Sequence, residues 1–119
     1  MNKILTNVNY HDTLNSGIKV IRVEFSEDYT KLDLGFLFSE KRKNVIKITD
    51  KIILSDYSEK RRLIQCEGIN LDEEVKLKSI KDFRYFTLKF APFEDIRDRL
   101  FLVQNDDQFG FIIMSIEEK

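Results

Sequence analysis

The only histidine and the only cysteine of the chain are the first residues to examine for chemistry. His11 lies in the polar stretch NYHDTLNSG, where no local motif supplies the partners that a metal site or a general base requires. Cys66 alternates with Ile64 along an expected strand, and Arg61 and Arg62 stand more than ~10 Å from the thiol, too far to activate it. A lone cysteine excludes an internal disulfide and a multi-cysteine metal site. We therefore predict a surface histidine and an inward-facing core thiol.

A run of amide and carboxylate side chains, Asn105-Asp106-Asp107 followed by Gln108, could supply oxygen ligands to calcium. Calcium loops place their ligands at alternating positions and add a distant bidentate carboxylate. Here the acidic residues are consecutive and Phe109 follows at once. Asn and Asp also tolerate turn conformations. We therefore predict a hairpin turn and no metal site.

Two basic clusters flank the segment 45–54 and form the candidate anion-binding patch: Lys41, Arg42, Lys43, Lys60, Arg61 and Arg62. They could meet at one end of the fold. No aromatic residues alternate with the basic ones, so a stacking platform for single-stranded nucleic acid is not indicated. Glu40 and Glu59 dilute both clusters. Solvated loop charges are the simpler interpretation, and nucleic acid is not the favoured partner.

Other motifs of catalysis and cofactor binding are missing from the sequence. It contains no glycine-rich phosphate loop, no paired-histidine zinc motif and no serine nucleophile elbow, so we expect no catalytic residue, cofactor or metal. The 20 Lys and Arg nearly cancel the 21 Asp and Glu, so no global field would attract nucleic acid or anionic lipid. Gly68, in CEGIN, is expected to mark a turn or a close backbone approach.

Nothing near the start of the chain reads as a targeting segment. MNKILTNVNYHD becomes polar after a short apolar pair and has no signal-peptide pattern. No run reaches the roughly 18 apolar residues of a membrane span. We therefore expect a cytoplasmic protein, or an extracytoplasmic one if the chain is a trimmed mature form.

The elements that must position these residues are predicted to be strands, because apolar residues recur at period two. The segment 32–38 shows one clean apolar face. The segment 18–25 changes phase, which predicts a β-bulge between Val20 and Ile21. The polar turn SEDYT should join the two as a hairpin. Further strands are expected at 45–54 (as one or two short strands), 61–69, 74–78, 83–90, 99–103 and 109–116.

Seven or eight short antiparallel strands at even spacing predict an all-β fold, an immunoglobulin-like β-sandwich. The 119 residues, with 42% hydrophobic content and ten Phe, favour one domain over 1–119 with a packed core. The segment 1–16 should be flexible or packed on the sheet. A helical turn is expected only at 92–99, where acidic residues follow a proline.

The stretch YFTLKFAPF shows how a strand is expected to end. Alternation places Phe86, Leu88 and Phe90 on one face, with Tyr85, Thr87 and Lys89 on the other. Pro92 lacks the N–H that would extend the ladder. We predict that the chain leaves the sheet there and that Phe93 closes one end of the core.

The last two strands carry apolar residues on both faces, whereas a two-layer sandwich buries only one face of each sheet. The second face is the candidate interface: Phe101, Val103, Ile112, Met114 and Ile116. Internal cover could come from Ile4, Leu5, Val8 and Tyr10, or from Phe93 and Ile96. A protein partner or a second copy of the chain would serve equally well.

Four segments of the chain carry a resemblance to a known family: CEGINL (66–71), YFTLKFAPF (85–93), LFLVQ (100–104) and FGFIIMSIE (109–117). In this order they resemble the "AEGI-L", "FTL-F-PLP", "F-F-E" and "F-I-GI" motifs of bacterial immunoglobulin-like β-sandwich domains of unknown function. The preceding ITDKIILSDYSEKRRLI resembles that family's "D--G--Y-L" turn and strand. The resemblance covers about residues 18–117 and implies the fold but no catalytic residue.

This chain departs from that family at two points: Phe93 stands where the family has leucine followed by proline, and the usual secretion signal is missing. The family domain often accompanies secreted thioredoxin-like domains. This chain has no CxxC motif, so no redox function carries over. We expect a non-enzymatic protein-binding or structural accessory module that acts through an apolar sheet face. The alternative is anion or nucleic-acid binding through the basic loops 41–43 and 60–62.

Overall fold

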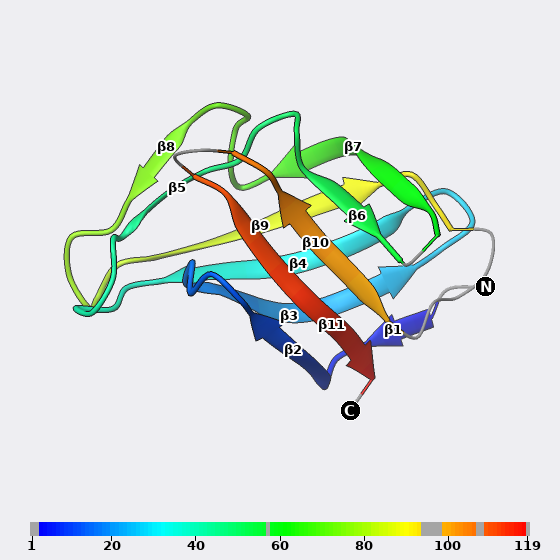
Figure 1. Cartoon of the computed structure of the whole chain (residues 1–119), viewed down its shortest axis with the longest axis horizontal. Coiled ribbons are helices and arrows are strands. Elements are labelled where there is room, and N and C mark those ends of the chain that lie inside the picture. The colour runs from blue at the N-terminus through cyan, green and yellow to red at the C-terminus, as the bar shows by residue number, and fades with distance from the viewer. Residues whose placement is uncertain (1–2, 57, 94–98, 107–108, 119) are drawn as a thin grey trace.

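The computed structural model describes residues 3–56, 58–93, 99–106 and 109–118, with only the backbone given for 114–118. The described residues form eleven strands and no helix (Figure 1). The strands are β1 (Lys3–Leu5), β2 (Val8–Asp12), β3 (Ile18–Phe25), β4 (Thr30–Leu37), β5 (Val45–Lys47), β6 (Ile53–Ser55), β7 (Lys60–Glu67), β8 (Glu74–Lys76), β9 (Phe83–Phe90), β10 (Leu100–Gln104) and β11 (Phe111–Glu118). The helical turn expected within 92–99 falls on residues 94–98, which lie outside the described residues.

Nine of these strands form one antiparallel sheet in the order β1-β3-β4-β9-β7-β6-β10-β11-β2, while β5 and β8 pair separately. Figure 1 shows the sheet as two layers, with β6, β10 and β11 crossing in front of β3, β4 and β9. We call the strands β6, β10, β11 and β2 the front layer, and β1, β3, β4 and β9 the rear layer. β1 and β2 follow each other in the chain yet stand at opposite ends of the sheet order, so the sheet is nearly closed and barrel-like.

The strand β7 connects the two layers because its two halves have different partners. Lys60–Arg62 pair with Ser55–Ile53 of β6, whereas the residues from Leu63 to Glu67 pair with β9. The register shifts between Leu63 and Gln65. Such an irregularity bends a strand and increases its twist, and here it carries the chain from one layer to the other.

The predicted all-β, antiparallel fold is confirmed, but the strand order shows a nearly closed sheet in place of two separate immunoglobulin-type sheets. Sequence alternation could not distinguish the two because both bury one face of each strand. The N-terminal segment 1–16 contributes to the sheet. Its described part forms β1, which pairs with β3, and β2, which pairs with β11, so it extends the sheet at both ends.

Local predictions in the first half of the chain are confirmed. The register between β3 and β4 shifts between Val20 and Arg22, where the bulge was expected. The turn after Phe25 is closed by the Ser26 N–H, which donates to the Tyr29 carbonyl at 2.9 Å. The Ser26 hydroxyl accepts from the Asp28 N–H at 3.2 Å, which is how serine stabilises such a turn. The segment 45–54 contains the two short strands β5 and β6.

The core lies between the layers and is filled by the inward residues of alternating strands. From the rear layer come Phe86, Leu88 and Phe90, which are all buried as predicted. The front layer and its neighbours contribute Leu54, Leu100, Leu102, Phe111 and Ile113. Burying one such side chain stabilises the fold by about 1.5–3 kcal/mol. Phe93 joins this core, also as predicted, and the Arg61 guanidinium lies 4.8 Å from its ring centroid.

A buried glutamine at the end of β10, Gln104, connects the small sheet to the large one through hydrogen bonds. Gln104 is 1% exposed. Its Oε1 accepts from the Thr49 N–H at 2.8 Å, and its Nε2 donates to the Lys47 carbonyl at 2.7 Å and the Phe109 carbonyl at 3.2 Å. Buried backbone groups need such partners. The residues after β5 are therefore held against the β10–β11 hairpin.

Candidate functional site

The two residues first examined for chemistry lie apart and have no catalytic surroundings. His11 is exposed on β2, as predicted. Cys66 is half-buried and packs against the core. Ile64, predicted to share its face, is instead 59% exposed, because the shifted register after Leu63 turns it outward. Among the described residues, no group of three or more His, Cys, Asp or Glu could hold a metal ion.

The acidic run after β10 forms a turn in its described part. The Phe109 N–H donates to Asp106 Oδ1 at 3.1 Å, and the Gly110 N–H donates to the Asp106 carbonyl at 3.0 Å. The flanking strands β10 and β11 pair in antiparallel fashion, as a hairpin requires. Asp107 and Gln108 lie outside the described residues. The predicted hairpin connection is confirmed.

The candidate interface on the outer side of the front layer is only partly open. Phe101, Val103 and Ile112 are half-buried, and the side chains of Met114 and Ile116 lie outside the description. Val103 stands opposite Ile53 on one neighbouring strand and opposite Ile112 on the other, so these three form a row across the layer.

The segments proposed as internal cover for that face go elsewhere. Leu5 and Phe93 are buried in the core, and Val8 packs against it. Ile4 and Tyr10 are partly exposed on the edge strands, and Ile96 lies outside the described residues. Val103 and Ile112 are therefore half-buried largely because they and Ile53 pack against one another as cross-strand neighbours.

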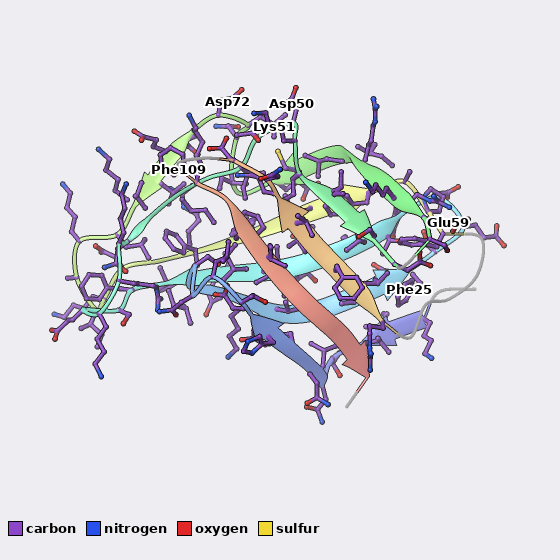
Figure 2. All side chains as sticks on the ribbon, viewed as in Figure 1. Phe25, Asp50, Lys51, Glu59, Asp72 and Phe109 are labelled. Atoms are coloured by element: carbon purple, nitrogen blue, oxygen red, sulfur yellow. The ribbon has the colours of Figure 1, made fainter. Side chains whose placement is uncertain are left out.

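The two basic clusters do not meet. Lys41–Lys43 follow β4, whose last residue Leu37 pairs with Phe83, whereas Lys60–Arg62 precede the residue that pairs with Phe90. Seven residue steps of a strand separate these ends, roughly 23 Å. Figure 1 shows the two loops at opposite ends of the long axis, and Figure 2 labels Glu59, next to the second cluster, at the right-hand end.

Two of the six basic side chains are also already engaged within the protein. Arg42 donates to the Leu37 carbonyl. Arg61 donates to the Pro92 carbonyl at 2.8 Å and pairs with Glu59 at 3.1 Å. Both guanidinium groups therefore make contacts within the fold. The six basic residues do not form a single anion-binding patch.

Among the described residues, the most exposed aromatic side chains lie on the outer side of the rear layer. Phe83 and Tyr85 are 56% and 57% exposed, and their ring centroids lie 5.0 Å apart. Tyr85 pairs with Gly35 in the register of β9 and β4. A Cβ at Gly35 would lie 3.1 Å from the tyrosine ring and 3.6 Å from Ile21 Cδ1, so the ring rests over bare backbone. We call Ile21, Gly35, Phe83 and Tyr85 the Tyr85 face.

A hollow of about 300 Å³ is lined by Tyr85 and Ile21 together with Glu67, Gly68 and Thr87. Gly68 has a φ of +81°, and a Cβ there would lie 2.7 Å from the Tyr85 carbonyl oxygen, which confirms the predicted close approach. On this side of β9, β7 ends at Glu67, opposite Thr87. Tyr85 is therefore flanked by a glycine on each side.

A groove of about 470 Å³ borders the Tyr85 face between β8 and the start of β9. Its lining shares Phe83 with that face and includes the basic residues Lys76, Lys78, Lys81 and Arg84. Arg84 pairs with Glu73 at 3.6 Å. The three lysine side chains make no ion pair within the described part of the chain. We call this feature the basic groove.

Sequence reasoning missed both features, although signals for them were present. Phe83 and Tyr85 sit two residues apart on the polar face of an alternating strand. The stretch KLKSIKDFRYF alternates basic and aromatic residues more closely than either predicted cluster. Tyr85 was placed on the outer face, but the bare backbone beneath its ring depends on Gly35, which belongs to another strand.

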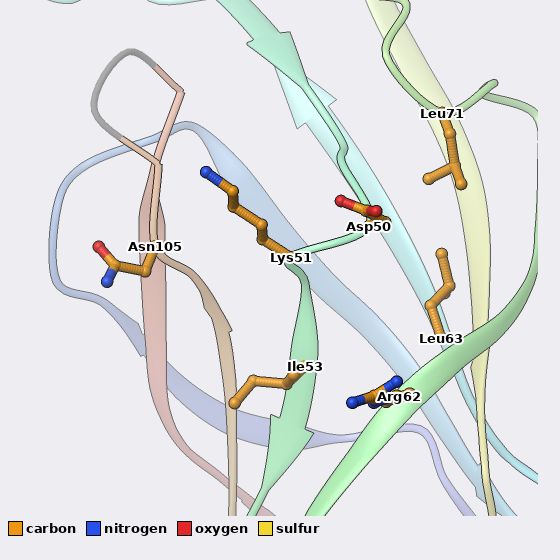
Figure 3. Close-up of a pocket in the computed structure, with 7 residues that line it drawn as sticks. All are labelled: Asp50, Lys51, Ile53, Arg62, Leu63, Leu71 and Asn105. Atoms are coloured by element: carbon orange, nitrogen blue, oxygen red, sulfur yellow. The ribbon is translucent and has the colours of Figure 1, made fainter.

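A third hollow, of about 760 Å³, lies where β6 and β7 separate, and we call it the split pocket (Figure 3). Its lining residues are Asp50, Lys51, Ile53, Arg62, Leu63, Leu71 and Asn105. Figure 2 shows Asp50 and Lys51 near Asp72 at the upper edge of the molecule. The Asp72 N–H donates to the Ile48 carbonyl at 2.8 Å, which joins the loops that carry them.

Comparison of the chain with family models, curated proteins and solved structures found no match in any of the three. The resemblance to the bacterial sandwich family therefore stays a prediction. None of the described residues belongs to a helix long and apolar enough to span a membrane.

Proposed function

We propose that the chain is a non-enzymatic protein-binding module whose binding surface is the Tyr85 face. The observation that supports this most directly is the pair Phe83 and Tyr85, each more than half exposed on a strand whose opposite face is buried. Exposed apolar surface of this kind typically marks an interface. Tyrosine is also among the residues that contribute most to binding energy at interfaces.

The charges beside this face suggest what the partner presents. The basic groove begins at Phe83 and holds three lysines without ion pairs, so an acidic segment would gain favourable contacts there. An apolar side chain of the same segment would pack against Tyr85, over Gly35. We therefore propose a partner segment that combines acidic residues with an apolar anchor.

Nucleic acid fits the same groove less well. Glu74 and Asp82 stand among the lysines, and Glu73 pairs with Arg84. An evenly charged phosphate chain would meet these carboxylates, whereas a protein segment can alternate its charges. Anion or nucleic-acid binding remains the second candidate function. The observation that favours it is the basic groove, since the loops 41–43 and 60–62 lie far apart.

The proposal is tested by capturing partners from the native host with wild-type protein, with Tyr85→Ser and Phe83→Ser, and with the control Lys60→Gln at the other end of the molecule. We expect a partner that wild type and the control retain and that both face variants lose. Purified partner should then bind wild type at least tenfold more tightly than Tyr85→Ser, which corresponds to about 1.4 kcal/mol. A partner held equally by all four proteins would contradict the proposal.

A second copy of the chain and nucleic acid are tested separately. If light scattering shows that wild type is a dimer and Tyr85→Ser a monomer, the partner at the Tyr85 face is a second copy of this chain and not a different protein. Titration with a fluorescent single-stranded oligonucleotide tests the alternative function. Tight binding that Lys76→Gln and Lys81→Gln abolish, with affinity falling steeply as salt is raised, would favour nucleic acid.

A further inference from the structure

The split pocket is separate from the proposed protein-binding face and has a clear origin in the strand pairing. β6 and β7 pair over only three residues each, Ile53–Ser55 with Arg62–Lys60. From Leu63 onward β7 pairs with β9, so a gap opens between Ile53 and Leu63. The pocket thus forms because β7 pairs with the front layer over its first half and with the rear layer over its second half.

The walls of this pocket are held in place by interactions that lie behind them. Lys51 and Ile53 follow Thr49, whose N–H is held at 2.8 Å by the buried Gln104 side chain. Leu71 precedes Asp72, whose φ is +65° and whose N–H donates to the Ile48 carbonyl at 2.8 Å. Preformed walls favour ligand binding because little ordering is needed when the ligand arrives.

One side of the pocket is apolar. Leu63 and Leu71 point toward each other across part of the hollow, and Arg62 lies between Leu63 and Ile53 (Figure 3). Leu71 is 42% exposed although its backbone is fixed. A ligand with a hydrocarbon group would bury this leucine together with the half-buried Leu63 and Ile53.

The charged side chains supply the second half of the recognition. Lys51 and Arg62 carry positive charge and make no ion pair within the described part of the chain, while Asp50 contributes one negative charge. The lining is therefore positive by one unit. A guanidinium binds a carboxylate through two parallel hydrogen bonds. A monocarboxylate neutralises the single net positive charge, whereas a phosphate dianion would leave an excess negative charge beside Asp50.

We propose that the split pocket binds a monocarboxylate attached to an apolar group. The carboxylate pairs with Arg62, and the apolar group packs between Leu63 and Leu71. The same chemistry belongs to a free medium-chain or branched acid and to the C-terminus of a peptide that ends in leucine.

The experiment is an NMR titration of the ¹⁵N-labelled chain with octanoate, followed at the backbone amides of residues 51, 53, 62, 63 and 71. Octanol and octyl phosphate are titrated in parallel, together with a short peptide ending in leucine as the free acid and as the amide. We expect saturable shifts at these amides with octanoate, and at least tenfold weaker binding of octanol. If the free-acid peptide binds more tightly than octanoate, the natural ligand is a peptide C-terminus. If octanoate binds more tightly, the natural ligand is a free acid.

Matched variants separate this site from non-specific association. Arg62→Gln and Leu71→Ser are expected to weaken octanoate binding about tenfold each, while Lys60→Gln, a neighbouring exposed cation on β7, leaves it unchanged. The absence of saturable shifts, equal binding of octanol, tighter binding of octyl phosphate, or an equal loss in Lys60→Gln would each overturn the proposal. None of these results bears on the Tyr85 face, whose test uses other residues.

Discussion

The outer faces of the two layers both carry apolar side chains, but among the described residues the rear layer leaves its aromatic side chains more exposed. On the front layer, Ile53, Val103 and Ile112 occupy directly opposed positions on three neighbouring strands and cover one another. On the rear layer, Tyr85 has Gly35 opposite it on β4, so no side chain from that strand covers it, and Tyr85 is 57% exposed. The exposure of an outward residue thus depends on the side chains across the strands, more than on the residue itself.

The largest effect is expected on the inner side of the front layer, at Gln104. Gln104→Ala would leave the Thr49 N–H and the Lys47 and Phe109 carbonyls without this partner in a buried place. We expect a loss of about 2–4 kcal/mol in the free energy of unfolding, measured by urea denaturation. Asn105→Ala, at the next and exposed position, is the control and should change stability by less than about 0.5 kcal/mol. Equal effects of the two substitutions would show that the buried network contributes little.

On the rear layer, Gly68 is the position where the flank of Tyr85 can be altered most strongly. Gly68→Ala places a Cβ 2.7 Å from the Tyr85 carbonyl oxygen at a φ of +81°, where side chains are strained. We expect a loss of about 1–3 kcal/mol in thermal or urea unfolding. If Gly68→Ala leaves the stability unchanged, the backbone at this position can shift to accept a side chain. The close approach to the Tyr85 carbonyl would then not require a glycine.

A direct comparison of the two faces comes from Val103→Ser and Tyr85→Ser. Val103 is packed between two apolar neighbours, so its truncation should cost about 1 kcal/mol of stability. Tyr85 rests on glycine backbone and its truncation should change stability by less than about 0.5 kcal/mol, while it abolishes partner capture. If the two stabilities changed in the opposite order, the front layer would be the better candidate for the interface.

The smallest effect concerns Tyr10 on β2, at the seam between the layers. Burial, and then the Asp12 carboxylate, raise the pKa of the Tyr10 phenol above its ordinary value of 10.0, although a hydrogen bond with the Val20 backbone lowers it. The unfolded chain therefore ionises first as the pH rises. This contribution to stability is complete below pH 10 and is lost above it.

Tyr10→Phe removes that ionisation and serves as the matched control. Urea midpoints measured at pH 8 and pH 10.5 should fall more for wild type than for Tyr10→Phe, by a few tenths of a molar unit at most. All other residues are the same in both proteins, so only the difference between the two declines reports on Tyr10. Parallel declines would mean that the phenol ionises as readily in the folded chain.

Much of the local structure could be predicted because it depends on residues close together in the chain. The inward set Phe86, Leu88 and Phe90 follows from alternation, the bulge after Val20 from a phase change, and the turn at Ser26 from its polar residues. Ile64 was placed on the wrong face because nothing in RRLIQCE marks the register shift that turns it outward.

The sequence by itself determined that the chain forms short antiparallel strands, roughly where most of them begin and end, and, for strands such as Phe83–Phe90, which residues face the core. These depend on side-chain alternation and turn residues, which act over a few positions. The tertiary structure alone decided that β7 serves both layers, that Gln104 is buried, that the basic clusters lie apart and that Tyr85 stands between two glycines. Each of these depends on pairings between residues distant in the chain, such as Gly35 with Tyr85 or Thr49 with Gln104, and local alternation is the same whichever strands become neighbours.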